Sequence, residues 1–385
     1  MRRFVRDSKN YIIPVAVAFF NVLLLLFPGD IVEAARAGLM MWFNNVLPAL
    51  LPFIVGTNIL AATGFVAYLG KLLDPLMLSL FRLPGAGGFA LVTGMMSGYP
   101  VGAKTAAALV GNGQISPGQG WRLAALCNNA GPLFMLGAVG AGLFADAGVG
   151  YFIMFAHYAS ALVVGLVLAR FAGGAARKDG GTLAQIVREA RRPRPFGEVL
   201  GTSVKNALET VAVVGGYIVL FAVIVRILDI LGLFEALSLL VRPLAGVDSA
   251  LLFSGTAVGV VEMTNGAWRL SEGGVSAYSL AALTFVISFG GFSIHAQSVS
   301  FLAKCGVSSV KYMLGKLLHG VVSAVIAFAA FDILGPAPRE AASVLFRHDA
   351  AVIRVLGYSS VLFAVSVTCL VLLALICRML VKRRY

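Results

Sequence analysis

Eight apolar segments constrain the fold of this chain most strongly, because a helix needs about 20 predominantly apolar residues to cross a lipid bilayer. The segments lie at about 11–28, 46–69, 121–145, 150–171, 207–231, 276–303, 312–335 and 351–378. Only 12% of the residues are charged, compared with about 25% in soluble domains. The chain is therefore predicted to be an all-α polytopic membrane protein of about eight transmembrane helices, with little room for a soluble domain.

The distribution of basic residues predicts the orientation of these helices. Most of the 30 Lys and Arg residues lie at the two ends and in loops on one side of the predicted topology, and such loops face the cytoplasm. They lie at 2–9, at 71 and 82, within 170–205, at Lys304, Lys311 and Lys316, and at 378–384. We therefore expect cytoplasmic N- and C-termini, and we attribute the net charge of +13 to topology rather than to nucleic-acid binding.

No residue pattern predicts an enzyme. Gly98, Lys104 and Thr105 have the spacing of a phosphate-binding P-loop, but Ala103 replaces its second glycine and no strand precedes the motif. The sequence also contains no nucleophile–base–acid set and no metal-ligand cluster. We expect neither catalysis nor a bound cofactor.

Two further apolar segments, 85–112 and 248–273, are interrupted near their middle by Gly, Pro or polar residues. Each is too interrupted to form one span and too apolar to form a loop. Backbone that is not helical at membrane depth has to be buried in protein or line a cavity. We predict that each segment is a re-entrant helical hairpin, and that residues 30–45 form a helix at the membrane interface.

The two hairpins belong to an internal repeat with an offset of 157 residues. The pattern SGxxVG at 97–102 returns at 254–259, and LAAL at 123–126 returns at 280–283. Each half is predicted to contain a hairpin followed by a broken helix, and three spans between the hairpins make the repeat inverted. Inverted repeats with broken helices, and a binding site at their interface, are typical of secondary transporters.

Polar residues of the first half gather around the predicted breaks. Pro100 and Pro132 suit the first position of a helix, and half-helix N-termini attract anions. The candidate binding residues here are Ser97, Gly98, Tyr99, Lys104, Asn128 and Asn129. The alternatives are that Lys104 extends to the inner membrane surface and that the asparagines only join helices.

The second half has its own polar set. The candidate binding residues are Glu262, Thr264 and Asn265 after the hairpin tip, and Ser293, His295 and Gln297 after the second break. Glu262 is expected to pair with Lys104, to take up a coupling proton or to help bind sodium. The alternatives are that Glu262 lies at the outer water interface and that His295 is a hydrogen-bonded structural residue.

Four motifs resemble the YlbJ family of sporulation integral membrane proteins, also called SpoVV. They are SGYPVGAK at 97–104, LCNNAGPLFMLGAVG at 126–140, EMTNG at 262–266 and SFGGFSIHAQ at 288–297. The resemblance covers nearly the whole chain, and the family belongs to the Gate, or nucleoside-recognition, domain group. It implies an architecture similar to that of concentrative nucleoside transporters, with two hairpins and two broken helices as inverted repeats.

The resemblance also implies a division of the chain. N-terminal spans and the interfacial helix occupy 1–84, a first Gate-like repeat 85–172, a cytoplasmic linker 173–206, a second Gate-like repeat 207–335 and a C-terminal span 336–385. The linker is expected to be either a helix on the inner membrane surface or a solvated tether.

By the same resemblance, the protein is expected to lie in the outer forespore membrane of a spore former and to move dipicolinic acid from the mother cell toward the forespore. Dipicolinate is a planar dianion that suits half-helix N-termini and Lys104, with Tyr99 or Phe292 stacking on its ring. The alternatives are a nucleoside-type carrier and a non-transporting membrane partner in spore-envelope assembly. The coupling ion, Na⁺ or H⁺, and a homo-oligomeric state stay open.

Overall fold

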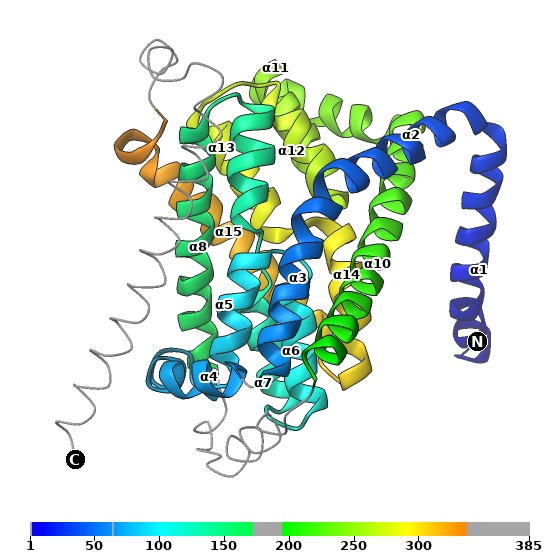
Figure 1. Ribbon diagram of the computed structural model, residues 1–385. Helices are drawn as coiled ribbons and strands as arrows, with labels where there is room; N and C mark the ends of the chain where they lie inside the picture. Colours follow the sequence, from blue (N-terminus) through cyan, green and yellow to red (C-terminus); the bar gives the residue numbers. More distant parts are fainter. Residues whose placement is uncertain (1, 64, 172–194, 337–385) are drawn as a thin grey trace.

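The computed structural model describes residues 2–63, 65–171 and 195–336, and every regular element in these ranges is a helix (Figure 1). The N-terminal part contains α1 (Arg2–Leu26), α2 (Pro28–Met41), η1 (Trp42–Val46), α3 (Leu47–Ala62), α4 (Phe65–Leu76) and η2 (Met77–Phe81). The next part contains α5 (Gly87–Ser97), α6 (Val101–Gly111), α7 (Pro117–Cys127), η3 (Leu133–Leu143) and α8 (Ala147–Arg170). The last part contains α10 (Phe196–Ile230), α11 (Leu233–Val261), α12 (Met263–Ser271), α13 (Ala277–Phe289), α14 (Gly291–Leu302), η4 (Ala303–Cys305) and α15 (Ser309–Leu334).

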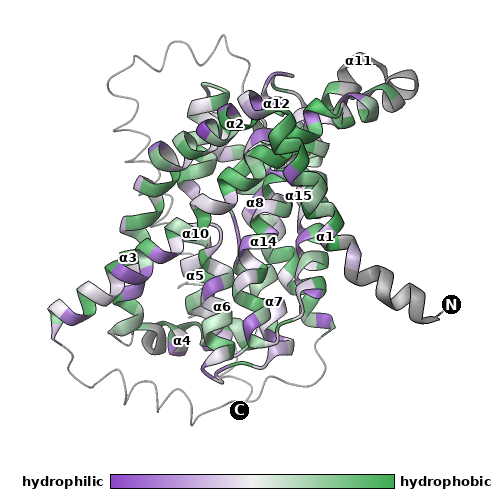
Figure 2. Ribbon diagram, turned by 90° about the vertical axis from the view of Figure 1, so that its right-hand side faces the viewer, coloured by the Kyte–Doolittle hydropathy of each residue, from purple (hydrophilic) through white to green (hydrophobic). Residues whose placement is uncertain are grey.

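Four stretches of the described chain are long and apolar enough to span a membrane, namely Ala147–Arg170, Phe196–Ile230, Ala277–Cys305 and Ser309–Leu334. A fifth results if the bent pair Ile13–Leu26 and Pro28–Asn44 counts as one span. These helices confirm an all-α membrane protein. Figure 2 shows hydrophobic residues along most of the length of these helices.

The predicted number of eight spans is not confirmed. The expected span at 46–69 is divided, because α3 ends at Ala62 and a separate helix begins at Phe65. The expected span at 121–145 is divided between α7 and η3. The span at 351–378, the basic groups at 378–384 and most of the linker at 173–206 lie outside the described residues.

The expected interfacial helix corresponds to α2, whose axis is bent by 102° from that of α1. Pro28 stands at the first position of α2, where its fixed φ starts a helix without losing a needed hydrogen bond. Helix α2 packs against α10: a Cβ on Gly38 would lie 3.0 Å from Ala222 Cβ, and Arg226 pairs with Asp30. Helix α1 stands apart at the edge of the bundle (Figure 1).

Both predicted hairpins are present. In the first, a Cβ on Gly94 of α5 would lie 3.0 Å from the Cα of Gly102 on α6, and the turn consists of Gly98, with φ of +84°, and a cis Tyr99–Pro100 bond. In the second, a Cβ on Gly266 of α12 would lie 2.1 Å from the Cα of Gly259 on α11. The arms of each hairpin therefore touch at the backbone, which only glycine allows.

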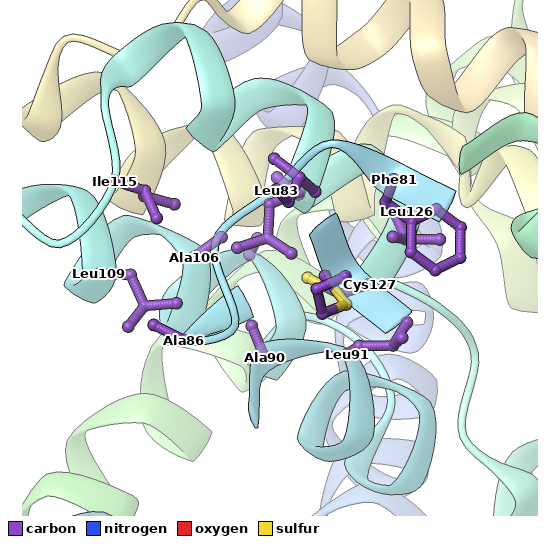
Figure 3. Packing of buried hydrophobic residues seen from close by; sticks show 14 of the residues in the cluster. Phe81, Leu83, Ala86, Ala90, Leu91, Ala106, Leu109, Ile115, Leu126 and Cys127 are labelled. Atoms are coloured by element: carbon purple, nitrogen blue, oxygen red, sulfur yellow. The ribbon is translucent and has the colours of Figure 1, made fainter. Parts of the chain in front are cut away.

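Both predicted helix breaks are present as well. Helix α7 ends at Cys127 and η3 begins at Leu133, and Asn128 leaves the helical conformation with φ of −85° and ψ of 89°. Helices α13 and α14 are separated at Gly290, whose φ of +90° favours glycine. The main apolar cluster lies where η2, α5, α6 and α7 meet, and Figure 3 shows Ala90, Ala106 and Cys127 packed within it.

Candidate binding site at the helix breaks

The tip of each hairpin lies directly against the break of the following broken helix. A Cβ on Gly98, at the first tip, would lie 2.8 Å from the backbone nitrogen of Gly131 in the first break. A Cβ on Gly291, at the second break, would lie 2.8 Å from the carbonyl oxygen of Gly259 and 3.1 Å from the nitrogen of Met263. Each hairpin tip therefore lies on the helix break of its own half, whereas a single binding site between the two tips stays a prediction.

Asn128 joins three helices at the first break. Its Oδ1 accepts from the backbone nitrogen of Ala103 at 3.2 Å, in the first turn of α6. Its Nδ2 donates to Ser298 Oγ on α14 at 2.8 Å and to the Tyr312 hydroxyl on α15 at 2.7 Å. Both donor hydrogens of the buried amide are used, so its geometry matches the structural alternative, in which the asparagine joins helices.

Tyr99 and Asn129 also make internal contacts. The Tyr99 hydroxyl donates to the carbonyl oxygen of Ile287 at 3.0 Å, at the end of α13, with Ser288 O at 3.3 Å. Asn129 Nδ2 donates to Leu126 O at 2.8 Å. Tyr99 therefore ties the first hairpin to the second broken helix.

Lys104 lies in the first turn of α6, and its Nζ donates to Thr210 Oγ1 at 2.5 Å. Thr210 is near the middle of the 35-residue helix α10 and donates in turn to Asn206 O at 2.7 Å. The ammonium group is thus held against the middle of the longest helix rather than at a helix end. Within the described ranges, no carboxylate forms an ion pair with it.

Glu262 does not pair with Lys104, and it is buried rather than placed at the water interface. It is the N-cap of α12, where its Oε2 accepts from the backbone nitrogen of Asn265 at 2.8 Å. A carboxylate at a helix N-terminus satisfies an otherwise unpaired N–H and interacts favourably with the helix dipole. Thr264 and Asn265 lie in the first turn of the helix that Glu262 caps.

Other predicted residues are buried without partners. In the described part of the chain, neither ring nitrogen of His295 and neither amide atom of Gln297 has a hydrogen-bond partner, and Ser97 Oγ also has none. His295 packs against the rings of Phe289 and Tyr312, at 4.5 and 5.5 Å between centroids. Native proteins rarely leave buried polar groups unpaired, so these groups are candidates to hydrogen-bond a ligand. Ser293 is also buried, on the first turn of α14.

The structure places Lys316 differently from the prediction made from the sequence. Lys316 was assigned to the cytoplasmic face, but it is 0% exposed. Its Nζ lies 2.8 Å from Asn128 O, 2.7 Å from His319 Nδ1 and 3.5 Å from Asn129 Oδ1. It lies inside an apolar span, and this position signals a functional or paired group.

Two histidines extend this cluster between the breaks, and neither was predicted from the sequence. His319 Nε2 donates to His157 O at 2.9 Å. His157 Nε2 accepts from Ala130 N at 3.0 Å, and its Nδ1 lies 2.7 Å from Ser288 Oγ. The cluster therefore connects the first break, at Ala130, with the end of α13 at Ser288. His319 lies three residues after Lys316, a spacing that places both on one helix face.

Comparisons with known proteins agree with this architecture of apolar helices. The Gate family, described as nucleoside recognition, matches residues 43–173. The sporulation integral membrane protein YlbJ of Bacillus subtilis (strain 168) is 34% identical over 328 residues, which cover 80% of this chain and 79% of that protein. No solved structure matches the chain.

Proposed function

Because the chain belongs to the YlbJ family of sporulation integral membrane proteins, as its motifs predicted, we propose that it transports a small organic dianion, dipicolinate, across a membrane during spore formation. The family and the apolar helices make it an integral membrane protein with a Gate domain. The substrate, the outer forespore membrane and transport from mother cell to forespore belong to the proposal.

The observation that carries the proposal is the spare binding capacity of Lys104. A lysine ammonium has three N–H donors, and this one has Thr210 as its hydrogen-bond partner among the described residues. A cation inside a membrane protein is costly unless it is paired or hydrated. Glu209 acts on Lys104 electrostatically without forming a direct ion pair, so a carboxylate of the substrate would supply the missing acceptors and a negative charge in direct contact.

The balance of interior charge near the first hairpin tip also favours an anion. Lys104 and Lys316 lie on either side of the contact between Ala103 and Asn128. Lys104 directly follows Ala103, whose backbone nitrogen donates to Asn128 Oδ1. Lys316 Nζ donates to the carbonyl oxygen of Asn128. The buried carboxylate is Glu262, and it is already used as the cap of α12. Glu209 on α10 interacts electrostatically with Lys104 but is exposed. Among the described residues, the two lysines therefore meet no buried carboxylate beside this tip, which favours a ligand with negative charge.

The unpartnered groups of α14 suit the rest of such a ligand. His295 and Gln297 are 2% and 1% exposed, and their side chains have no hydrogen-bond partner in the described part of the chain, so the substrate would gain these contacts without breaking existing ones. Dipicolinate has a ring nitrogen and four carboxylate oxygens to accept hydrogen bonds from such donors. A binding site discriminates strongly against a ligand that leaves its buried polar groups unpaired.

The arrangement of hairpins and broken helices supports transport rather than static binding. Each half has the order hairpin, broken helix and long helix, and each tip lies on its own break. We propose that the two halves form an inverted repeat and that the site becomes accessible to each side in turn, as in other secondary transporters with broken helices.

The proposal is tested by measuring dipicolinate flux into vesicles that contain the purified full-length protein. Lys104→Ala should reduce flux by about tenfold or more, because a hydrogen bond to a charged group is worth about 1.5–3 kcal/mol. Lys71→Ala, at an exposed lysine of α4, is the matched control and should leave flux unchanged. Equal flux in both variants would remove Lys104 from the site, and no flux in the wild type would refute the proposed substrate.

A nucleoside-type carrier is the second candidate, because the matching family is described as nucleoside recognition. Competition binding separates the two: dipicolinate, but not uridine, should displace bound dipicolinate from the purified protein. Displacement by uridine at similar concentration would favour the nucleoside carrier. A protein that binds neither and co-purifies with another spore-envelope protein would favour a non-transporting role.

A further inference from the structure

Lys316 is held by the first helix break in the way that a bound metal cation is held. Its Nζ lies 2.8 Å from the carbonyl oxygen of Asn128, which follows the last residue of α7. Asn129 Oδ1 lies 3.5 Å from the same Nζ. The ring of Tyr99 covers the ammonium group, with Nζ 5.3 Å from the ring centroid.

The contacts of Lys316 match the hydrogen-bond pattern of an ammonium group. His319 Nε2 faces a carbonyl oxygen, that of His157, and must donate to it, so the Nδ1 of a neutral His319 is an acceptor. Lys316 then faces three acceptors, which match the three donors of an ammonium group. An alkyl amine is ordinarily a stronger base than an imidazole, so the hydrogen between Nζ and Nδ1 is assigned to Lys316.

Each surrounding group stabilises positive charge without being an anion. The carbonyl end of a helix carries a partial negative charge, and the face of a tyrosine ring attracts cations. Within the described residues, no carboxylate pairs with Lys316. Carriers with broken helices bind their coupling Na⁺ at such unwound carbonyls and half-helix C-terminal ends.

We propose that Lys316 is a built-in cation that occupies a sodium-type position at the first break, so that this protein works without Na⁺. Transport without Na⁺ rests on the proposed transport function, but the position of the Lys316 ammonium group at the first break rests on the geometry alone. It also separates the two lysines: all donors of Lys316 are used within the protein, whereas Lys104 keeps donors for the substrate.

The two histidines act as positioning residues for this cation. His157 is fixed by Ala130 N and Ser288 Oγ, and its carbonyl oxygen fixes the tautomer of His319. His319 then presents an unprotonated Nδ1 to Lys316. The cation at the first break is thereby linked to Ser288, near the end of α13 at the second break.

The test compares thermal unfolding of the purified full-length protein in NaCl and in choline chloride of equal ionic strength. Wild type should unfold at the same temperature in both salts. Lys316→Ala should unfold several degrees lower in choline, because it leaves the carbonyls without a cation, and Na⁺ or methylammonium should restore part of the loss. Lys311→Ala, at an exposed lysine of the same helix, should behave like wild type in every salt.

Several results would overturn the inference. One is a wild type with a higher unfolding temperature in NaCl than in choline chloride. The other is a Lys316→Ala protein whose unfolding temperature rises with neither Na⁺ nor methylammonium. If Lys316→Ala cannot be purified folded, the wild-type comparison decides. In the flux assay, wild-type dipicolinate transport should be equal in the two salts, and transport that needs Na⁺ would also overturn it. A wild type that moves no dipicolinate but shows the expected unfolding temperatures refutes the transport proposal and leaves the built-in cation standing.

Discussion

The close approach of the first hairpin to α7 makes Gly94 the most informative position for a packing test. A Cβ at Gly94 would lie 1.9 Å from the carbonyl oxygen of Cys127 and 2.9 Å from its carbonyl carbon. Ordinary contacts between a carbon and an oxygen are about 3.3 Å or longer. Helices α5 and α7 would have to separate by more than an ångström to accept Gly94→Ala.

The expected loss can be estimated from two opposing effects. Alanine is favoured over glycine in a helix by about 0.8–1 kcal/mol, whereas overpacking a core costs about 1–3 kcal/mol, and more where backbone is the obstacle. Gly216→Ala in α10 is the matched control, because nothing lies within 4 Å of its Cβ. The helix-propensity gain is common to both variants and cancels, so relative to this control Gly94→Ala should be destabilised by the overpacking cost, about 1–3 kcal/mol or more.

A thiol-reactive fluorophore provides the assay, because Cys127 is buried and reacts when the packing around it opens. The Gly94→Ala protein should show its thermal transition well below that of Gly216→Ala. The same separation would lengthen the 3.2 Å bond from Ala103 N to Asn128 Oδ1, so dipicolinate flux should also fall. Transitions at the same temperature in both variants would refute the close contact between α5 and α7.

Three further predictions use the same unfolding assay. Asn128→Ala leaves several buried groups unpaired and should cost about 2–4 kcal/mol, whereas Asn44→Ala, at an exposed asparagine, should change little; equal stability of the two would contradict the joining role. Glu262→Ala should cost about 1 kcal/mol as a lost N-cap, and Glu262→Gln, whose amide oxygen still accepts, should recover most of that loss. A Glu262→Gln protein as unstable as Glu262→Ala would show that the negative charge itself is needed. Tyr99→Phe should lower the free energy of unfolding by about 0.5–1.5 kcal/mol, whereas Tyr278→Phe, at an exposed ring, should leave it unchanged. Equal stability of Tyr99→Phe and wild type would show that the hydrogen bond of the Tyr99 hydroxyl is dispensable.

The hairpins and the breaks could be predicted from the sequence because their signals are local. Glycine and proline inside an apolar run predict a turn or break wherever they occur, and Gly98 and Gly290 adopt the left-handed backbone that explains them. The number of spans was harder to predict. Residues 46–69 are apolar throughout, so their hydropathy gives no sign that α3 ends at Ala62 and α4 begins at Phe65. Hydropathy alone does not report a change of helix direction.

The partners of the polar residues could not be predicted, because they come from distant parts of the chain. Asn128 binds Ser298 and Tyr312, which are 170 and 184 residues away, and Lys104 binds Thr210. Charge counting assigned Lys316 to a cytoplasmic loop, although it lay within the predicted span 312–335. An ionisable residue inside such a span was itself the signal of an internal role.

The two hairpin tips differ in charge, and this difference bears on where a dianion binds. In the first half, the N-terminus of α6 is capped by the neutral amide of Asn128, and Lys104 and Lys316 lie on either side of that contact. In the second half, the N-terminus of α12 is capped by the carboxylate of Glu262. A helix N-terminus that already holds a carboxylate repels a second one, whereas a neutral cap leaves the positive end of the helix dipole uncompensated. For the proposed dianion, the first tip is therefore the more favourable of the two places.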